Sequence, residues 1–321
     1  MVIRELWHTS TEKSEIFSKD FETNDPSKIL IKTSYSLVST GTERIVSLGK
    51  VPSQIEQLMK VPGMEGSFSF PVKYGYSIVG EVIDGEKSWI GKQVHLMHPH
   101  QDFAYVSPNQ VSIIPDGVPV IRASLASLME TAVNAVWDSG VSIGDTVLIN
   151  GFGTVGALLS YVLSQIPGVN LAVNEISSER RQIAESMGFK VLKNGEKAEF
   201  DLSFNATAKS DGLQFCLDHT SYEGTIVELS WFGDTAAELK LGGNFHIRRQ
   251  RIISSQVSNI PGSRLNRWNY KRRKDLVFNL LENPVFDNLL KYQVPFSKAP
   301  ETFDLIRKGS INDICITFNY Q

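Results

Sequence analysis

The chain has 321 residues, 41% hydrophobic and 21% charged, which is the composition of an ordinary globular protein and excludes a disordered one. Its 32 basic and 35 acidic residues give a net charge of −3, which argues against nucleic-acid binding. No run approaches the ~18 consecutive apolar residues of a membrane span, and residues 1–15 lack the apolar core of a signal peptide. Two cysteines, Cys216 and Cys315, cannot build a disulfide framework or a four-cysteine zinc lobe. We therefore expect a cytoplasmic protein with no nucleic-acid or membrane partner.

The predicted elements change character along the chain. Residues 29–35 and 76–83 are β-branched or aromatic runs, and turn signals stand at 84–85 and 115–117, so the first third is β-rich. A helix is predicted over 123–138, after which strands and helices alternate, as in a parallel, doubly wound sheet. The expected strands are 146–150, 170–174, 190–192, 201–205, 225–231 and 251–257, and the expected helices are 156–165 and the segment from 177 or 178 to 188. A helix over 276–281 and a closing strand over 311–320 complete the prediction.

A glycine-rich loop is the most informative motif. Gly151, Gly153 and Gly156 form a GxGxxG pattern that follows a predicted strand and opens a predicted helix. The first glycine allows a tight turn, the second lets the backbone approach a pyrophosphate, and the third lets helix and strand pack closely. Thr154 and Val155 complete the loop at the start of the helix, whose free N–H groups and dipole favour an anion. The pattern predicts a dinucleotide site.

The residues after the next strand bear on the choice of cofactor. Glu175 lies 19 positions beyond Gly156, close to the spacing expected of an acid that binds the adenosine ribose. A carboxylate there favours NAD, because it repels the 2′-phosphate of NADP. Arg180 and Arg181 follow shortly and are the alternative, since they could hold such a phosphate. Asn205, which ends a later predicted strand, is placed among the cofactor-binding residues only by the family resemblance given below.

A β-rich region, a dinucleotide fold and a return segment, in this order, resemble the medium-chain dehydrogenase/reductase superfamily of the zinc alcohol dehydrogenase type. The runs at residues 39–43 (Ser-Thr-Gly-Thr-Glu), 75–82 and 151–156 carry the resemblance. The first run is also similar to that of bacteriochlorophyllide a dehydrogenase, a member of the same superfamily, although five residues imply no chlorin substrate. The resemblance implies an α/β protein, with a GroES-like catalytic domain at 1–122 and 261–321 and a Rossmann domain at 123–260.

The chain departs from the family at the zinc ligands. The family's Cys and His positions hold Thr40 and Tyr76, and the third ligand falls near Ser127. Hydroxyl groups are poor zinc ligands beside thiolate and imidazole. The four-cysteine lobe is replaced by the short segment 95–102. We therefore expect no catalytic zinc and no metal site.

Three residues are the candidates for catalysis. Thr42 matches the family's hydroxyl residue that binds the substrate oxygen and starts a proton relay; alternatively, it satisfies the backbone of a turn. Tyr76 either donates to a carbonyl oxygen or fills the space of the missing metal. His98 is the candidate general acid. A metal site made of His95, His98 and His100, or histidines that only pack a turn, are its alternatives.

Two possible roles are open for each of three further features of the sequence. Glu130, in the helix predicted over 123–138, either reaches the cleft expected between the domains or pairs locally. The basic stretch 264–274 holds six Lys or Arg in eleven residues; it is either a solvated face or a site for an anion. Cys216 falls on an apolar helix face and is expected to be a core thiol rather than a nucleophile.

The sequence as a whole favours an NAD(P)H-dependent oxidoreductase that moves a hydride to or from a carbonyl or alcohol without zinc. Reduction of a conjugated C=C bond, as by quinone and enoyl reductases, is the first alternative. An NAD(P)H-binding sensor or structural protein without turnover is the second. The expected partner is a small-molecule substrate, and the resemblance adds a homodimer.

Overall fold

A computed structural model describes residues 1–320. The chain forms two compact units. Unit 1 contains Met1–Ser127, Phe278–Ile311 and the described residues from Cys315 onward, and unit 2 contains Leu128–Val277 and Asn312–Ile314. The first segment of unit 1 thus extends beyond the predicted boundary at 122 to Ser127, and unit 2 extends beyond the predicted boundary at 261 to Val277. The short segment Asn312–Ile314 also belongs to unit 2, although both of its flanks belong to unit 1.

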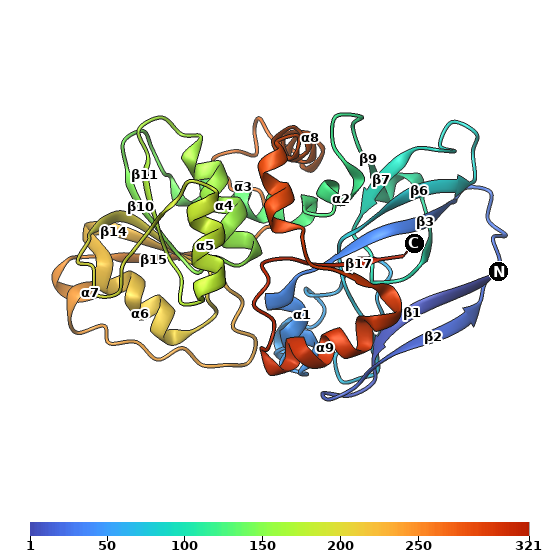
Figure 1. The fold of residues 1–321 in the computed structure, drawn as a ribbon, viewed down its shortest axis with the longest axis horizontal. Coiled ribbons are helices and arrows are strands. Elements are labelled where there is room, and N and C mark those ends of the chain that lie inside the picture. Colours follow the sequence, from blue (N-terminus) through green and yellow to red (C-terminus); the bar gives the residue numbers. More distant parts are fainter. Residues whose placement is uncertain (321) are drawn as a thin grey trace. The chain divides into compact units, whose positions relative to one another are not determined.

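Unit 1 is built from two sheets. The strand order is β2-β1-β5-β4 in the smaller sheet and β16-β17-β3-β6-β7-β9 in the larger one, where β8 also pairs with β3. Figure 1 labels most of these strands. The strands are β1 (Val2–His8), β2 (Ser14–Asp20), β3 (Ile29–Val38), β4 (Glu65–Gly66), β5 (Val72–Lys73), β6 (Ile78–Asp84), β7 (Gln93–Leu96), β8 (Phe103–Val106), β9 (Val111–Ile113), β16 (Gln293–Pro295) and β17 (Ile316–Asn319).

Helices and hydrophobic clusters complete unit 1. One cluster of aliphatic side chains lies on the large sheet, and a second, with Phe296, Phe303 and Phe318, lies where β17 meets the C-terminal helix α9. The helices are α1 (Thr40–Ser47), α2 (Val120–Ala123) and α9 (Ala299–Lys308), with 3₁₀ turns at Ser53–Ile55, Pro108–Gln110, Pro284–Leu289 and Phe296–Lys298. Helices α3 (Ala126–Ser139) and α8 (Tyr270–Leu281) lie mostly in unit 2.

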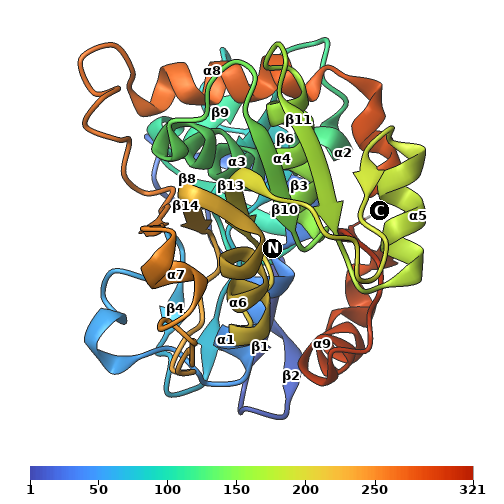
Figure 2. The ribbon, with the colours of Figure 1, turned by 90° about the vertical axis from the view of Figure 1, so that its left-hand side faces the viewer.

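Unit 2 contains a six-stranded parallel sheet with the order β12-β11-β10-β13-β14-β15. The order reverses at β10, which is the switch point where doubly wound folds bind dinucleotides. Figure 2 shows β10 and β11 with helix α4 beside them. The elements are β10 (Thr146–Asn150), α4 (Thr154–Ser164), β11 (Asn170–Asn174), α5 (Ser178–Ser186), β12 (Lys190–Val191), β13 (Phe200–Asn205), α6 (Ser210–His219), β14 (Thr220–Glu228), α7 (Asn244–Ile247) and β15 (Arg251–Ser254).

The predicted alternation of strands and helices in unit 2 is confirmed, with differences at the ends. The helix predicted over 123–138 is α3, which begins three residues later, and α2 ends at Ala123. Strand β14 begins five residues before the predicted strand 225–231 and ends at Glu228. The predicted strand 311–320 is ordered as β17 only over Ile316–Asn319, because Asn312–Ile314 packs in unit 2. Across residues 1–320, every helix is too short or too polar to cross a membrane.

Candidate functional site

The glycine-rich loop of unit 2 has the geometry that its sequence predicts. Gly151 has φ of +100°, which side chains rarely tolerate. A Cβ on Gly156 would lie 2.0 Å from the carbonyl oxygen of Gly151, so only glycine lets α4 start this close to β10. Gly153 is the N-cap of α4 and supplies no side-chain cap. The loop therefore presents a helix N-terminus and open backbone, as a phosphate site requires.

Glu175 lies at this loop and is almost fully buried. One carboxylate oxygen accepts from the amide of Phe152 at 2.7 Å, and the other accepts from the amides of Ile176 at 2.7 Å and Ser177 at 2.9 Å. A carboxylate offers about four acceptor positions. Three are filled by backbone, which fixes the carboxylate against the glycine-rich loop and leaves one for a ligand hydroxyl.

The two arginines that follow are held by backbone carbonyls. Arg180 donates to the carbonyls of Asn312 at 2.7 Å and Asp313 at 3.2 Å, and its Nη1 would lie 3.9 Å from a Cβ on Gly153. Arg181 donates to the carbonyls of Glu175 at 3.0 Å and Leu192 at 2.8 Å. Arg180 thus borders the predicted phosphate loop, whereas Arg181 is bound within the fold.

Thr154, also predicted at the loop, begins α4, and its hydroxyl donates to the carbonyl of Ile314 at 2.6 Å. The bond ties the segment Asn312–Ile314 to the start of this helix. Val155, the next residue, is half-buried. Thr154 therefore supports the loop through its side chain, and a ligand would meet its backbone.

The carboxyl ends of four adjacent strands carry a row of polar side chains. Asn174 donates to Asn150 at 2.7 Å, Asn150 donates to Asn205 at 3.4 Å, and Asn205 donates to Glu228 at 2.7 Å. Asn205 is fully buried, and its side-chain amide is hydrogen-bonded to Asn150 and Glu228. Its predicted contact with a cofactor therefore stays a prediction. Sequence reasoning missed Glu228, whose only signal was an acid in the middle of the strand predicted over 225–231.

In unit 1 the two predicted catalytic hydroxyls lie together. The Tyr76 hydroxyl donates to the hydroxyl of Ser39, and a hydrogen bond also joins it to Thr42. Burial raises the pKa of Tyr76 to about 12, and the negative charge of Glu43 acts in the same direction. The phenol therefore keeps its proton at neutral pH and can act as a hydrogen-bond donor.

A buried acid–imidazole pair that sequence reasoning missed lies beside these hydroxyls. Glu43 accepts from the amide of Ser39 at 2.8 Å, and its other oxygen lies 2.8 Å from Nε2 of His100. Nδ1 of His100 is 2.7 Å from the hydroxyl of Ser36, which is 2.9 Å from the hydroxyl of Tyr320. Glu43 and His100 are both fully buried, so they hold the start of α1 in place.

The environment of His98 does not favour the predicted role of general acid. Its ring is buried against Gly63, where a Cβ would lie 2.6 Å from Nε2, and its Nδ1 is 3.1 Å from the carbonyl of Pro99. Burial lowers the pKa of His98 to about 4, more than the hydrogen bond to Pro99 raises it. The ring is therefore neutral at pH 7 and has no imidazolium proton to give.

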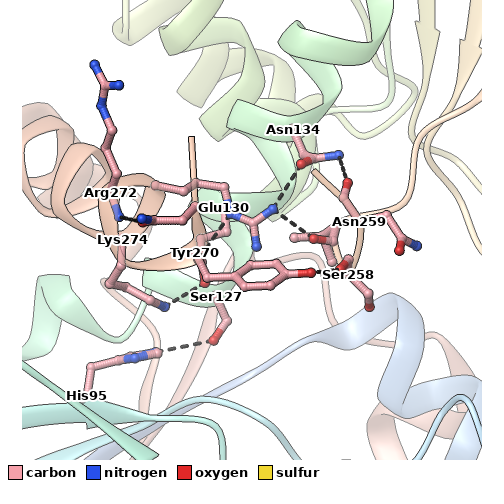
Figure 3. Close-up of polar contacts among 12 residues, drawn as sticks. His95, Ser127, Glu130, Asn134, Ser258, Asn259, Tyr270, Arg272 and Lys274 are labelled. Atoms are coloured by element: carbon pink, nitrogen blue, oxygen red, sulfur yellow. Dashed lines mark hydrogen bonds and ion pairs between the residues drawn. The ribbon is translucent and has the colours of Figure 1, made fainter. Parts of the chain in front are cut away.

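The donors at the family's zinc positions do not fit a zinc ion. Thr40, Tyr76 and Ser127 offer hydroxyls, and the hydroxyl of Ser127 donates to the Tyr76 carbonyl at 2.9 Å and lies 3.2 Å from Nε2 of His95 (Figure 3). In the alternative set, His95 contacts Ser77, His98 contacts the carbonyl of Pro99 and His100 contacts Glu43. Within residues 1–320 no group of three His, Cys, Asp or Glu side chains could hold a metal ion.

Glu130 and part of the basic stretch form a buried ion cluster in unit 2. Glu130 pairs with Arg273 at 3.2 Å and with Lys274 at 2.5 Å, and Arg273 also donates to Asn134 at 2.9 Å (Figure 3). Of the two roles expected for Glu130, the structure therefore supports pairing with nearby charged residues. The other basic residues of 264–274 lie on or near the surface, and Arg272 stacks 4.2 Å from the ring centre of Trp268.

Cys216 is the core thiol that the helical pattern predicts. It is fully buried in α6 and packs with Leu213, Leu217 and Ile226. Burial raises the pKa of the thiol, with Glu228 adding to the shift. A protonated, inaccessible thiol is not a nucleophile.

Comparisons with known proteins agree with this fold. No family model matches the chain. D-guloside 3-dehydrogenase of Shigella flexneri is 24% identical over 205 residues, which is 59% of this chain and 59% of that protein; the match therefore spans less than two thirds of the relative's length. These comparisons do not support the similarity of residues 39–43 to bacteriochlorophyllide a dehydrogenase.

Solved structures match over nearly the whole chain. A zinc-binding dehydrogenase from Sinorhizobium meliloti 1021 bound to NADP has a TM-score of 0.77 at 15% identity, covering 99% of both chains. A protein described as a short-chain alcohol dehydrogenase from Escherichia coli CFT073, solved with NADH, has a TM-score of 0.76 at 15% identity over the same share of both chains. The expected α/β class, a GroES-like part with a Rossmann part, is confirmed. The chain is thus a relative of the zinc-type alcohol dehydrogenase-like proteins and has the fold of the medium-chain dehydrogenase/reductase superfamily.

Proposed function

We propose that the protein is a nicotinamide-dependent oxidoreductase that transfers a hydride between the cofactor and an alcohol or carbonyl group. The glycine-rich loop carries the proposal. Its backbone leaves no room for a side chain at Gly156 and holds Glu175 beside the first turn of α4. These are the features that bind a pyrophosphate and the adjoining ribose. When bound, the nicotinamide cofactor supplies or accepts the hydride.

The same geometry favours NAD over NADP. Glu175 keeps one acceptor position for a ribose hydroxyl, and its charge repels a 2′-phosphate. Both arginines that could hold that phosphate already bind backbone carbonyls, each through two nitrogens. Ile176, 86% exposed next to Glu175, offers an apolar surface of the kind that an adenine ring packs against. NADP nevertheless occurs in a structural neighbour, so both cofactors belong in the assay.

The substrate oxygen is bound by hydroxyls rather than by zinc in this proposal. Tyr76 remains protonated and Thr42 hydrogen-bonds to it, so the pair can donate to a carbonyl oxygen as negative charge develops there. In the reverse direction Tyr76 can accept the alcohol proton as it gives its own proton to the hydroxyl of Ser39, which in turn releases one to solvent. By analogy with the guloside relative, we propose a secondary hydroxyl of a sugar derivative or small polyol as the substrate group.

Cofactor binding and turnover test this function. We expect NADH to bind more tightly than NADPH, and a panel of polyols and ketones to give turnover in its presence. Thr42→Val is expected to reduce kcat with unchanged cofactor affinity, while Thr23→Val, at an exposed position of the same unit, leaves both unchanged. Tight NADH binding with no turnover across the panel would support a sensor instead.

Two further measurements separate the alternatives. A conjugated enone distinguishes the two reductions, since an allylic alcohol supports carbonyl reduction and a saturated ketone indicates a C=C reductase. The metal content of the native protein, measured beside a zinc-loaded relative, tests the zinc-free mechanism. About one tightly bound zinc per chain would contradict it.

We also propose a homodimer formed along β15. This strand is the outer strand of the unit 2 sheet, and Arg251, Ile252 and Ser254 are exposed along it. An exposed strand edge is a natural pairing surface. Light scattering at micromolar concentration tests the proposal, and a monomeric mass would contradict it.

A further inference from the structure

The polar row at the carboxyl edge of the unit 2 sheet joins residues in strict register. Asn150 pairs across the ladder with Asn174 on one side and with Asn205 on the other, and Asn205 pairs with Glu228. Each of these residues is the last of its strand. Four parallel strands therefore end on one continuous line of hydrogen-bonded side chains, and Glu228 is its half-buried end.

The carboxylate of Glu228 and the carbonyl of Gly212, which accepts from Asn150 at 2.7 Å, together set the direction of the row. An ionised carboxylate only accepts hydrogen bonds, so Asn205 must turn its NH₂ toward Glu228 and its oxygen toward Asn150. Asn150 must then accept from Asn174, as observed. All three amide dipoles consequently point their donors toward Glu228, and hydrogen bonds in such a chain strengthen one another. The backbone amide of Ser230 adds a further donor at 2.7 Å.

Glu228 differs from Glu130 and Glu5, two other acids removed from solvent, because no cation neutralises it. Glu130 has Arg273 and Lys274 as partners, and Glu5 has Lys73. Among the ion pairs of residues 1–320 none includes Glu228. Burial raises the pKa of this carboxyl, while the hydrogen bonds from Asn205 and Ser230 hold the ionised form. The sheet edge thus carries an uncompensated negative charge, which is costly in a fold unless a ligand makes use of it.

The location suggests what that ligand group is. In a doubly wound fold the dinucleotide lies across the carboxyl ends of two mononucleotide-binding halves. Here β10, β11 and β12 form the half with the glycine-rich loop and Glu175, which serves the adenosine side. The other half, β13, β14 and β15, therefore serves the nicotinamide side. Glu228 ends the middle strand of that half.

We propose that the negative charge of Glu228 stabilises the oxidised, positively charged nicotinamide ring of the bound cofactor relative to the neutral, reduced ring. The inference rests on the proposed cofactor function and goes beyond it, because it assigns a redox bias to one side chain. A carboxylate near a ring that gains a positive charge on losing hydride favours NAD⁺ over NADH. The bound cofactor therefore becomes a stronger hydride donor, which favours carbonyl reduction over alcohol oxidation.

Equilibrium binding of both redox forms tests the proposal without turnover. Titration calorimetry gives the ratio of the Kd for NAD⁺ to the Kd for NADH in the wild type, Glu228→Gln and Glu228→Asp. We expect Glu228→Gln to raise this ratio about tenfold, equal to about 1.4 kcal/mol, and Glu228→Asp, which keeps the charge, to stay near the wild type. Glu223→Gln is the matched control, since Glu223 is an exposed acid of the same strand.

The outcomes separate this proposal from the proposed function. If the wild type binds both forms and Glu228→Gln leaves the ratio unchanged, the charge has no such role and the cofactor function stands. If the Gln and Asp variants change the ratio equally, shape rather than charge is responsible and the proposal is wrong. If the wild type binds neither form, both proposals fail. Glu228→Met is a second uncharged variant and must give the same rise in the ratio, should the Gln variant not fold.

Discussion

Replacing Glu175 by glutamine tests the link between the fold of the loop and its cofactor choice. The carboxylate accepts three backbone hydrogen bonds with its two oxygens, whereas a glutamine has one oxygen. It can serve either the buried amide of Phe152 or the amides of Ile176 and Ser177, and its NH₂ then faces a donor. Loss of at least one bond to a charged acceptor costs about 1.5–3 kcal/mol. We expect Glu175→Gln to destabilise the chain by this amount.

The same substitution is expected to change cofactor selectivity. Two unit charges about 5 Å apart repel by about 1–3 kcal/mol at the effective dielectric of a protein surface. Removing the carboxylate charge therefore removes its repulsion of the 2′-phosphate of NADPH, whereas NADH has no such phosphate. Loss of the ribose acceptor weakens NADH in addition. The ratio of the two dissociation constants should therefore move toward NADPH by tenfold or more, which fluorescence titration with each cofactor measures.

Hydrogen exchange locates the stability effect. A peptide containing Phe152 should lose amide protection in Glu175→Gln, and Glu185→Gln, at an exposed position of helix α5, should leave it unchanged. Urea denaturation gives the loss in unfolding free energy for both variants. Wild-type stability together with wild-type selectivity in Glu175→Gln would refute the role assigned to this carboxylate.

Three other predictions concern both units. Gly156→Ala should abolish NADH binding because its Cβ would lie 2.0 Å from a backbone oxygen, whereas Gly242→Ala, with open space around it, should bind normally in the same titration. Tyr76→Phe should reduce kcat by about 10²–10³-fold, as loss of one oxyanion donor does, and should lower the unfolding free energy by about 1 kcal/mol, because the buried hydroxyl of Ser39 loses its donor. Burial lowers the pKa of His8 to about 3 and of His98 to about 4, so the unfolded chain binds more protons below pH 6. The unfolding free energy measured in urea should therefore be constant above about pH 7.5 and fall by about 2.3 kcal/mol per pH unit between about pH 6 and 4; a flat profile would contradict the two shifts.

The dinucleotide unit was predictable because its signals are local. Buried parallel strands are short apolar runs, and a glycine pattern between a strand and a helix places the loop within a residue or two. The end of β14 shows the limit of such reasoning. Apolar residues continue to Trp231, but the amide of Ser230 bonds to the side chain of Glu228 and leaves the ladder. A strand end decided by one side chain cannot be read from hydropathy.

The C-terminal return segment shows why long-range pairing was not predictable. Residues 311–320 look like one strand, yet Ile314 accepts a bond from Thr154 and the carbonyl of Asn312 accepts one from Arg180. Those partners are more than 130 positions away in the sequence. The pair of Glu43 and His100 was missed for the same reason. An acid and a histidine that lie 57 residues apart show no periodicity in the sequence from which their contact could be predicted.

The hydroxyls at the zinc positions change the electrostatics that the neighbouring residues must satisfy. A zinc ion would add two positive charges beside a phenol and a buried carboxylate, and it would lower the pKa of any hydroxyl it bound. In this chain Glu43 instead has His100 as its partner, and its charge helps to raise the pKa of Tyr76 to about 12. The phenol is consequently a donor over the whole physiological range, which is the property that oxyanion stabilisation needs. In the proposed zinc-free mechanism, the acid in α1 therefore helps to keep protonated the hydroxyl that would stabilise the substrate oxyanion.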